Sequence, residues 1–335
     1  MPQNSNPSVP NPPQSDDSAA LFLLTESSLH AGTGSTLSYV DLPIQREVHS
    51  GHPIVYASSV KGALRERKGL TEQQKDVLFG PKNSDYSGRA IIQEARVLLF
   101  PVRSFHGTFA WVTCEAVLSR LRRDLAARRL ALPPSVSSVL KQGETASFCS
   151  ISKVAPQGKA LLEDYCYDSA APSPPAVPGA AAHVEQSPLD RLANWIATHA
   201  IGANELDWWR EKLKLDIVLV HDDDFTFFVK VHTQIQTHVS IDKDTQIAAS
   251  SGPRNEESLP PDTLLYSMVT IQKPLHDGAI KVFKTATEGL DAFQKSLTTN
   301  SRFHLCGNRT LGEGMVSAAI YRSAAAAPQM EAAKV

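Results

Sequence analysis

Short apolar runs alternate with helix-forming stretches along the whole 335-residue chain. Runs of this kind predict buried strands, here at residues 19–25, 89–100, 108–113, 217–220, 225–232 and 263–272, and at two places within 303–321. Apolar residues at helical spacing predict helices at about residues 59–68, 115–130, 191–215 and 290–299. No repeat recurs at a fixed spacing. The interleaving predicts an α+β fold, and we expect an RRM-like (ferredoxin-like) core with long insertions.

The two ends and two internal segments differ in composition from the rest of the chain. Residues 1–18 are polar and rich in proline, which predicts a disordered N-terminal tail, and residues 323–335 predict a frayed C-terminal tail. Residues 168–188 are rich in proline and alanine without an apolar period, as in a flexible insertion. Residues 233–261 are polar and long for a connection, and such connections are usually functional or disordered. We therefore predict one domain over residues 19–322.

Composition and charge narrow the class of protein. No apolar run approaches the roughly 20 residues of a membrane helix, and the N-terminus lacks a basic leader with an apolar core, so we expect a cytoplasmic protein that makes no contact with membranes. Four scattered cysteines make a structural zinc site improbable. The net charge of -2 argues against bulk attraction to nucleic acid. Local clusters of cations still permit a basic groove. They comprise Arg46, Lys61, Arg65, Arg67 and Lys68, and a second group from Arg120 to Arg129.

The segment from residue 30 to residue 65 combines glycines, one acid and several cations. Ser58 and Ser59 predict the N-cap of a short helix, whose N-terminal N–H groups and dipole attract anions. Lys61, placed in its first turn, and Arg65 lie four residues apart on one helical face. The segment therefore predicts a phosphate-binding site. The alternative is a capped surface helix with solvated cations, which is the more common use of such a sequence.

Three glycines occur in the eight residues 307–314, between two predicted strands. The pattern is neither a P-loop nor a dinucleotide fingerprint. A tight turn or bulge that needs positive φ is the commoner explanation. The alternative is a bare backbone that lies against a nucleic-acid strand.

Asp41 stands alone before a proline-containing loop, where an aspartate is usually a turn residue. On RNA, one carboxylate can orient the 2′-hydroxyl of the substrate, accept its proton or hold a divalent ion. His30 is a plausible partner as acid or base, because histidine suits proton transfer at neutral pH, although a lone histidine is more often structural.

Three segments resemble the backbone subunit of the type III-B CRISPR (Cmr) effector complex, in the RAMP superfamily. The first runs from residue 29 to residue 65 and contains VDLPIQRE at 40–47, HSG at 49–51 and SSVKG at 58–62. The second contains EESLP at 256–260 and DTLLYS at 262–267. The third is the glycine loop at 307–314, and the order and spacing of the three also fit.

The resemblance implies subunits that stack along a guide RNA, each with a protruding thumb that interrupts the guide–target duplex. It implies that target RNA is cut beside each thumb, and the thumb falls on residues 233–261. The catalytic aspartate, also a ligand of a divalent cation (Mg²⁺ or Mn²⁺), falls on Asp41, with His30 and Glu257 as further catalytic candidates. The RNA-binding candidates are Arg46, Ser59, Lys61, Arg65, Gly307, Arg309, Thr310 and Gly312. The implied partners are a guide crRNA, a complementary target RNA, further copies of this chain and other Cmr subunits.

The chain departs from the family pattern at several positions. Ser38 and Tyr39 replace a commoner glycine-containing pair, Val48 replaces a basic residue, Arg309 stands where an acid is frequent, and Asn255 replaces an aromatic in the thumb. Three other functions stay open at this point. They are a backbone subunit of the Csm-type (III-A) complex, a non-catalytic scaffold of the same fold in which Asp41 caps a turn, and an unrelated α+β enzyme with a phosphate site.

Overall fold

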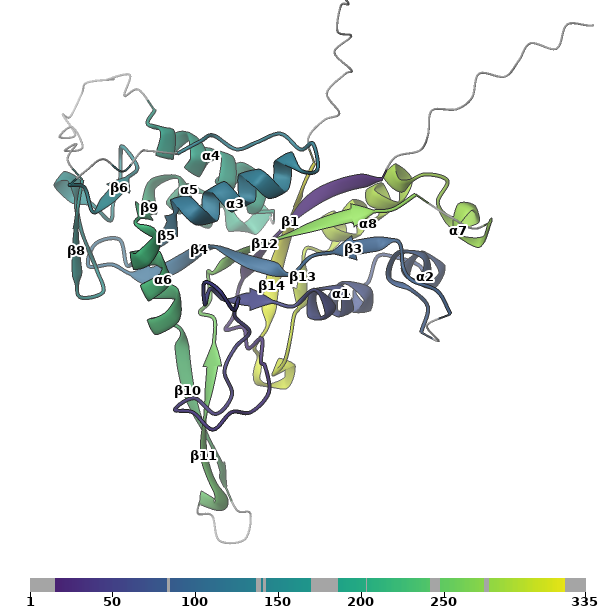
Figure 1. Cartoon of the computed structure of the whole chain (residues 1–335), viewed down its shortest axis with the longest axis horizontal. Coiled ribbons are helices and arrows are strands. Elements are labelled where there is room, and N and C mark those ends of the chain that lie inside the picture. Colours follow the sequence, from purple (N-terminus) through teal and green to yellow (C-terminus); the bar gives the residue numbers. More distant parts are fainter. Residues whose placement is uncertain are drawn as a thin grey trace, which may run out of the picture.

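A computed structural model describes residues 16–82, 85–136, 140, 143–169, 186–202, 204–241, 248–273 and 277–322 (Figure 1). Most of the predicted N-terminal tail, residues 170–185 of the predicted insertion and residues 323–335 lie outside the described part of the chain.

One large sheet organises the described residues. Its order is β13-β14-β1-β12-β4-β5-β9-β6, with β2 paired to β4 and β3 paired to β12. Its pairs are antiparallel except for β5 and β9, which run parallel. The strands are β1 (Asp17–Thr25), β2 (Ile54–Val55), β3 (Ala90–Ile92), β4 (Ala95–Arg103), β5 (Phe109–Cys114), β6 (Ala146–Phe148), β9 (Ile217–Val220), β12 (Leu264–Ile271), β13 (Arg302–His304) and β14 (Met315–Tyr321).

Helices pack around this sheet and close the core. The fully buried side chains come from strands and helices alike, with Phe22 and Trp111 on strands and Phe225 and Phe293 on helices. The helices are α1 (Ala57–Glu66), α2 (Glu72–Phe79), α3 (Glu115–Ala126), α4 (Pro188–Ala200), α5 (Asp207–Asp216), α6 (Asp222–Val231), α7 (Asp277–Val282) and α8 (Ala286–Thr299), with 3-10 turns η1 (Pro156–Gly158), η2 (Asn204–Leu206) and η3 (Arg309–Leu311). No described helix is both long enough and apolar enough to cross a bilayer.

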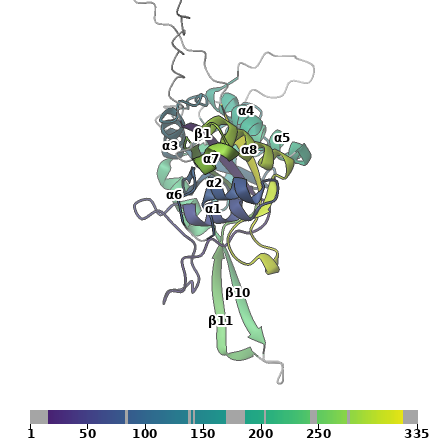
Figure 2. The ribbon, with the colours of Figure 1, turned by 90° about the vertical axis from the view of Figure 1, so that its right-hand side faces the viewer.

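Two hairpins stand outside the large sheet. The small one joins β7 (Lys159–Leu162) to β8 (Tyr165–Asp168). The long one joins β10 (Gln234–Ile241) to β11 (Ala248–Ser258) and projects away from the body between α6 and α1 (Figures 1 and 2). The segment 233–261, predicted as a thumb, therefore contains a projecting β-hairpin.

The α+β prediction is confirmed, and most predicted strands occur within a few residues of their expected ends. The prediction of a strand over residues 225–232 is wrong, because this segment lies in α6. Asp222, Asp223 and Asp224 occupy the first turn of α6, where the helix dipole favours acids. Phe225, Phe228 and Val229 then bury one helical face. The single helix predicted over 191–215 is in fact two, α4 and α5.

The predicted N-cap of α1 is also wrong. Tyr56 holds that position, with φ -56° and ψ 142°, and no side chain caps the helix. The helix therefore starts at Ala57, Ser58 and Ser59 lie in its first turn, and Lys61 opens its second turn.

Candidate nucleic-acid interface

Two neighbouring segments of the N-terminal region pair with each other and with distant strand β11 at the base of the long hairpin. Residues 29–33 and 42–46 run side by side through Thr33 N to Pro43 O at 3.1 Å and Gln45 N to Ala31 O at 2.8 Å. Residues 42–44 also pair with β11, where Leu42 N donates to Asn255 O at 3.0 Å and Glu257 N donates to Leu42 O at 3.0 Å. This pairing fixes the loop that carries Asp41 against the hairpin (Figures 1 and 2).

Asp41 is held by the backbone of β11. Its Oδ2 accepts a hydrogen bond from Asn255 N at 2.7 Å. Its Oδ1 has no partner among the described residues, and the side chain is half-buried. The carboxylate is therefore oriented by one oxygen and open to a ligand at the other.

Gln45 ties the same loop to helix α1. Its Nε2 donates to Gly32 O at 3.0 Å, and its Oε1 accepts from Tyr56 N at 2.6 Å. The start of α1 is thereby held beside the loop that follows His30.

Arg46 and Glu257 form an ion pair at the centre of this region. Arg46 Nη2 donates to Glu257 Oε1, and Arg46 Nη1 donates to the carbonyls of Gly51 and Val229, each at 2.9 Å. Glu257 also accepts from Thr233 Oγ1 at 2.8 Å and from Ile44 N at 3.0 Å, and it is 5% exposed. Glu257 accepts from three protein groups and Arg46 donates to three, so this geometry favours anchoring roles for both side chains. The catalytic role of Glu257 and the guide-binding role of Arg46 stay predictions that the geometry does not favour.

Glu47 anchors the end of the VDLPIQRE segment to helix α3 and strand β4. It accepts from Arg120 Nη1 at 2.6 and 2.8 Å and from Ser50 Oγ at 2.6 Å, and it lies 3.3 Å from Arg96 Nε. Burial alone would raise the pKa of Glu47, but the hydrogen bonds from Arg120 and Ser50 and the charges of Arg120 and Arg96 outweigh burial and lower this pKa. The ionised form therefore stabilises the fold.

We expect the stability difference between the wild type and Glu47→Gln to depend on pH. A pKa lowered by folding contributes stability above the unfolded pKa, near 4.5, and that contribution disappears as pH falls through the folded pKa. Urea unfolding should give a constant difference from pH 7 to about pH 5, and a smaller one at lower pH. A difference that disappears between pH 7 and pH 6 would contradict this assignment.

His30 lies beneath two loops. Its Nδ1 is 2.6 Å from Glu257 O and 3.5 Å from Glu256 Oε1, so we assign the ring proton to Nδ1. A Cβ on Gly32 would come within 2.4 Å of His30 Nε2, so this glycine is what lets the loop pass over the ring. The side chain is 13% exposed. The structure thus brings His30 and Glu257 together, with Asp41 attached to the same strand two residues away.

Asn308 fastens the glycine loop to the hairpin. Its Nδ2 donates to Glu256 Oε1 and, at 3.0 Å, to Glu313 Oε2, both on buried acids. Asn308 adopts φ 57°, a left-handed conformation that asparagine tolerates. The loop tip is exposed, and it carries the RNA-binding candidates Gly307, Arg309, Thr310 and Gly312.

Helix α1 offers an uncapped N-terminus without an acid in its first turn. Such an end presents free backbone N–H groups to an anion. Ser59 lies there, half-buried. Lys61 is also half-buried, burial lowers its pKa, and it has no ion pair among the described residues. An ammonium that has lost water without gaining an acid suits a phosphate ligand.

Several of the other predicted cations are paired with acids within the protein. Arg65 bonds the Gly80 carbonyl and pairs with Asp76 of α2 at 2.8 Å, which fixes α1 to α2. In the second cluster, Arg120 pairs with Glu47 and Arg123 with Asp124. The predicted RNA-binding role of Arg65 is therefore not favoured, and Lys61 is the cation of α1 best placed to meet an anion.

The side chains at Asp41 do not form a closed metal site. Among the described residues, no cluster of three or more histidines, cysteines or acids is suited to a metal ion. Mg²⁺ is often held by one or two carboxylates together with substrate phosphates and water. Asp41 fits a divalent cation in that shared manner.

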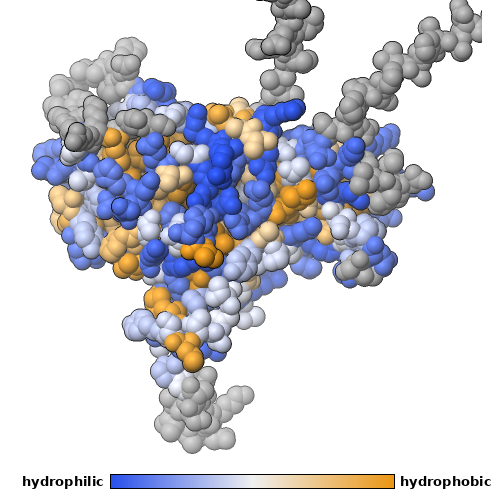
Figure 3. Space-filling model, viewed as in Figure 1, coloured by the Kyte–Doolittle hydropathy of each residue, from blue (hydrophilic) through white to orange (hydrophobic). Residues whose placement is uncertain are grey.

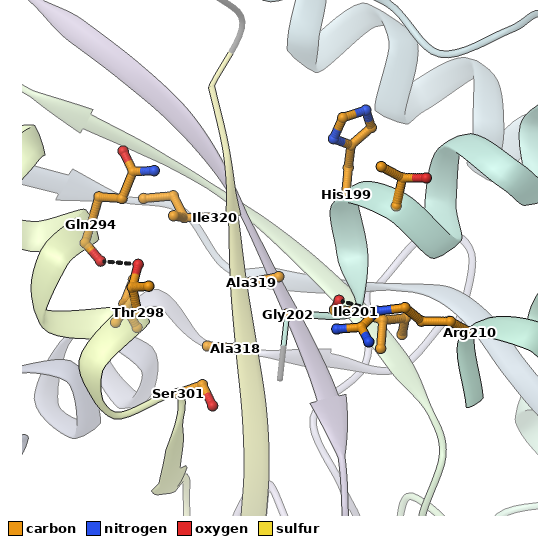
Figure 4. Close-up of a pocket in the computed structure, with 12 residues that line it drawn as sticks. His199, Ile201, Gly202, Arg210, Gln294, Thr298, Ser301, Ala318, Ala319 and Ile320 are labelled. Atoms are coloured by element: carbon orange, nitrogen blue, oxygen red, sulfur yellow. Dashed lines mark hydrogen bonds between the residues drawn. The ribbon is translucent and has the colours of Figure 1, made fainter. Parts of the chain in front are cut away.

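A polar pocket of about 280 Å³ lies elsewhere, between α4–α5 and α8 with β14 as its floor (Figure 4). Arg210 at its rim donates to Ile201 O at 3.1 Å, and Thr298 donates to Gln294 O at 3.0 Å. Its lining contains no carboxylate, and none of the predicted site residues lines it.

The sequence reasoning missed the residues that connect the site. Gln45 joins two segments through backbone groups, Asn308 joins the glycine loop to Glu256, 52 positions away, and Glu313 supports Asn308 within the loop. The sequence pointed to these residues only through their positions. Gln45 lies within the VDLPIQRE motif, and Asn308 and Glu313 lie within the glycine loop.

Comparisons with known proteins agree with this architecture. The sequence profile of the RAMP superfamily matches residues 22–310. The "CRISPR system Cmr endoribonuclease Cmr4" of Pyrococcus furiosus is 28% identical over 301 residues, which cover 88% of this chain and 92% of that protein. A crystal structure of oligomeric Cmr4 from the same organism superposes with a TM-score of 0.65 at 24% identity, covering 92% and 100% of the two chains. A chain from a cryo-EM structure of the type III-B Cmr-beta complex bound to cognate target RNA superposes with a TM-score of 0.65 at 17% identity. The match covers 92% of this chain and 98% of that chain. The chain belongs to the RAMP superfamily.

Proposed function

We propose that this chain is the repeated backbone subunit of a type III-B CRISPR (Cmr) ribonucleoprotein, which binds guide RNA and cuts complementary target RNA. The observation that carries the proposal is the Asp41 carboxylate, oriented by Asn255 N and open at Oδ1, at the base of a projecting hairpin. Similarity to the Cmr4 endoribonuclease over 88% of the chain supports the same reaction. Similarity to oligomeric Cmr4 and to a Cmr complex with target RNA supports self-association and an RNA partner.

The proposed reaction uses the 2′-hydroxyl of the target RNA. Asp41 Oδ1 takes the proton of that hydroxyl, the 2′-oxygen bonds to the adjacent phosphorus, and the bond from phosphorus to the 5′-oxygen of the next nucleotide breaks. The 5′-oxygen takes up a proton, which leaves a 2′,3′-cyclic phosphate and a 5′-hydroxyl. His30 and Glu257 contribute by holding the loop and β11 in place, since their polar groups already face protein partners.

A divalent cation, Mg²⁺ or Mn²⁺, would be held by Asp41 together with the RNA phosphate. The chemistry it supplies when bound is neutralisation of the phosphate charge.

Guide RNA lies, in this proposal, across the start of α1 and along the glycine loop. Replacing Lys61 with alanine should weaken RNA binding and reduce the salt slope of log K by about 1, equally for all sequences, because phosphate contacts carry no sequence information. Filter binding across a series of salt concentrations measures both the affinity for RNA and its dependence on salt. The control is Lys295→Ala, an equal change of charge on the exposed face of α8. A loss confined to some RNA sequences would contradict a phosphate contact.

The experiment that tests the function uses the assembled, guide-loaded complex and end-labelled target RNA. A complementary target should yield products at regular spacing when a divalent ion is present, and a scrambled target or added chelator should yield none. Guide-dependent binding without any products would leave only the scaffold function. Cleavage that ignores the guide would overturn the proposal.

A further inference from the structure

The loop in front of the hairpin presents an aromatic side chain to solvent beside Asp41. Tyr39 is 84% exposed and lies two residues before Asp41. Leu37 in the same loop is 111% exposed, and the space-filling view shows scattered apolar side chains over the hairpin region (Figure 3). The Tyr39 ring has no hydrogen bond or ring contact among the described residues.

The backbone around Tyr39 is nevertheless fixed. Thr36 N donates to Asp41 O at 2.9 Å and Thr36 Oγ1 donates to Val40 O at 2.9 Å, which closes the loop on itself. Asn255 Nδ2 donates to Tyr39 O at 3.3 Å, while Asn255 N donates to Asp41 Oδ2 at 2.7 Å. One residue of the hairpin therefore sets the positions of both Tyr39 and Asp41.

Single exposed apolar residues are common on protein surfaces. Tyr39 differs because its backbone is anchored while its ring is free, and because it shares that anchor with an open carboxylate. Arg254, next to Asn255, is exposed and has no acid partner among the described residues, so a cation lies on the strand that holds the loop. Exposed aromatic rings are a usual platform for unstacked nucleobases.

We propose that Tyr39 stacks on the base of the target nucleotide at the cut position and so places its ribose against Asp41. The ring takes any base, because every base has an aromatic face. Tyr39 is in this sense a positioning residue. The inference rests on the proposed RNA cleavage at Asp41, and it adds the group that holds the displaced nucleotide there.

The test places 2-aminopurine at one cut position of the target, in guide-loaded complexes that carry Tyr39, Tyr39→Phe or Tyr39→Leu. Stacking quenches 2-aminopurine, so we expect low fluorescence with tyrosine and phenylalanine and a clear rise with leucine. Loss of one stacked base corresponds to a roughly 5- to 150-fold effect, so the single-turnover rate should fall by about 10-fold or more for leucine and stay within about 3-fold for phenylalanine. Leucine preserves an apolar side chain but removes the aromatic face, so the comparison with phenylalanine isolates the contribution of stacking.

The fluorescence is also measured in complexes that carry Asp41→Asn as well, so that the target stays whole. If wild-type complexes do not cut RNA, the proposed function fails, but quenching that depends on an aromatic at residue 39 would still support stacking. Equal fluorescence and equal rates for tyrosine and leucine would overturn the inference. Failure of the Tyr39→Leu complex to assemble would also overturn it, because Tyr39 would then be a contact between subunits.

Discussion

Glu257→Ala should destabilise the folded chain by about 3 kcal/mol, the scale seen when one partner of a buried ion pair is removed. The change leaves Arg46 beside the hairpin without its acid, and it leaves Ile44 N and Thr233 Oγ1 without an acceptor. In a domain of this size the melting temperature should fall by roughly 5 °C. Thermal unfolding of the full chain, followed by circular dichroism, measures the shift.

The matched control is Glu66→Ala, which removes an exposed glutamate at the end of α1 and should change stability by about 0.5 kcal/mol or less. Equal melting temperatures for Glu257→Ala and the wild type would show that the ion pair does not hold the loop to β11. Such a result would reopen a catalytic role for Glu257.

A 2′-deoxy nucleotide at one cut position should abolish cleavage at that position. The nucleophile is absent there, and the other cut positions keep theirs. Gel analysis of end-labelled target should show loss of a single band from the regular series, with the remaining bands unchanged.

A 2′-deoxy nucleotide one position away serves as the control and should leave every band in place. Continued cutting at the deoxy position would mean that water, and not the 2′-oxygen, attacks the phosphate. Asp41 would then act on a water molecule, and the product ends would be a phosphate and a hydroxyl without a cyclic form.

The fold was predictable where a segment has a continuous apolar run or one clear hydrophobic period. Strand β1 buries every residue from Ala19 to Thr25, and α3 and α8 each bury a regular stripe. The prediction failed for α6, where the apolar run 225–231 fits a strand and a helix equally well. Tertiary contacts, together with the three aspartates at its start, decide whether such a segment forms a helix or a strand.

The site was predictable in its chemistry but not in its connections. Asp41 was recognisable because a lone carboxylate can accept a proton or hold a metal ion. Lys61 was recognisable because a lysine near the start of a helix can bind phosphate. Their surroundings depend on contacts across more than 200 positions, such as Asn255 with Asp41 and Arg46 with Glu257. The hydrophobic periodicity of a sequence does not predict contacts between residues so far apart. The sequence therefore pointed to Arg46, Arg65 and Glu257 as functional groups, whereas the structure pairs them with each other or with Asp76.

The most direct test of the account is the single-turnover cleavage rate of a guide-loaded complex that carries Asp41→Asn. Asparagine keeps an oxygen for the hydrogen bond from Asn255 N, so the loop and the guide binding should be unchanged, while the group that takes the 2′-proton is lost. We expect the rate to fall by about 100- to 10,000-fold, the range for loss of a general base. Cleavage at the wild-type rate and at the same regular positions would contradict it and place the nuclease in another residue or another subunit.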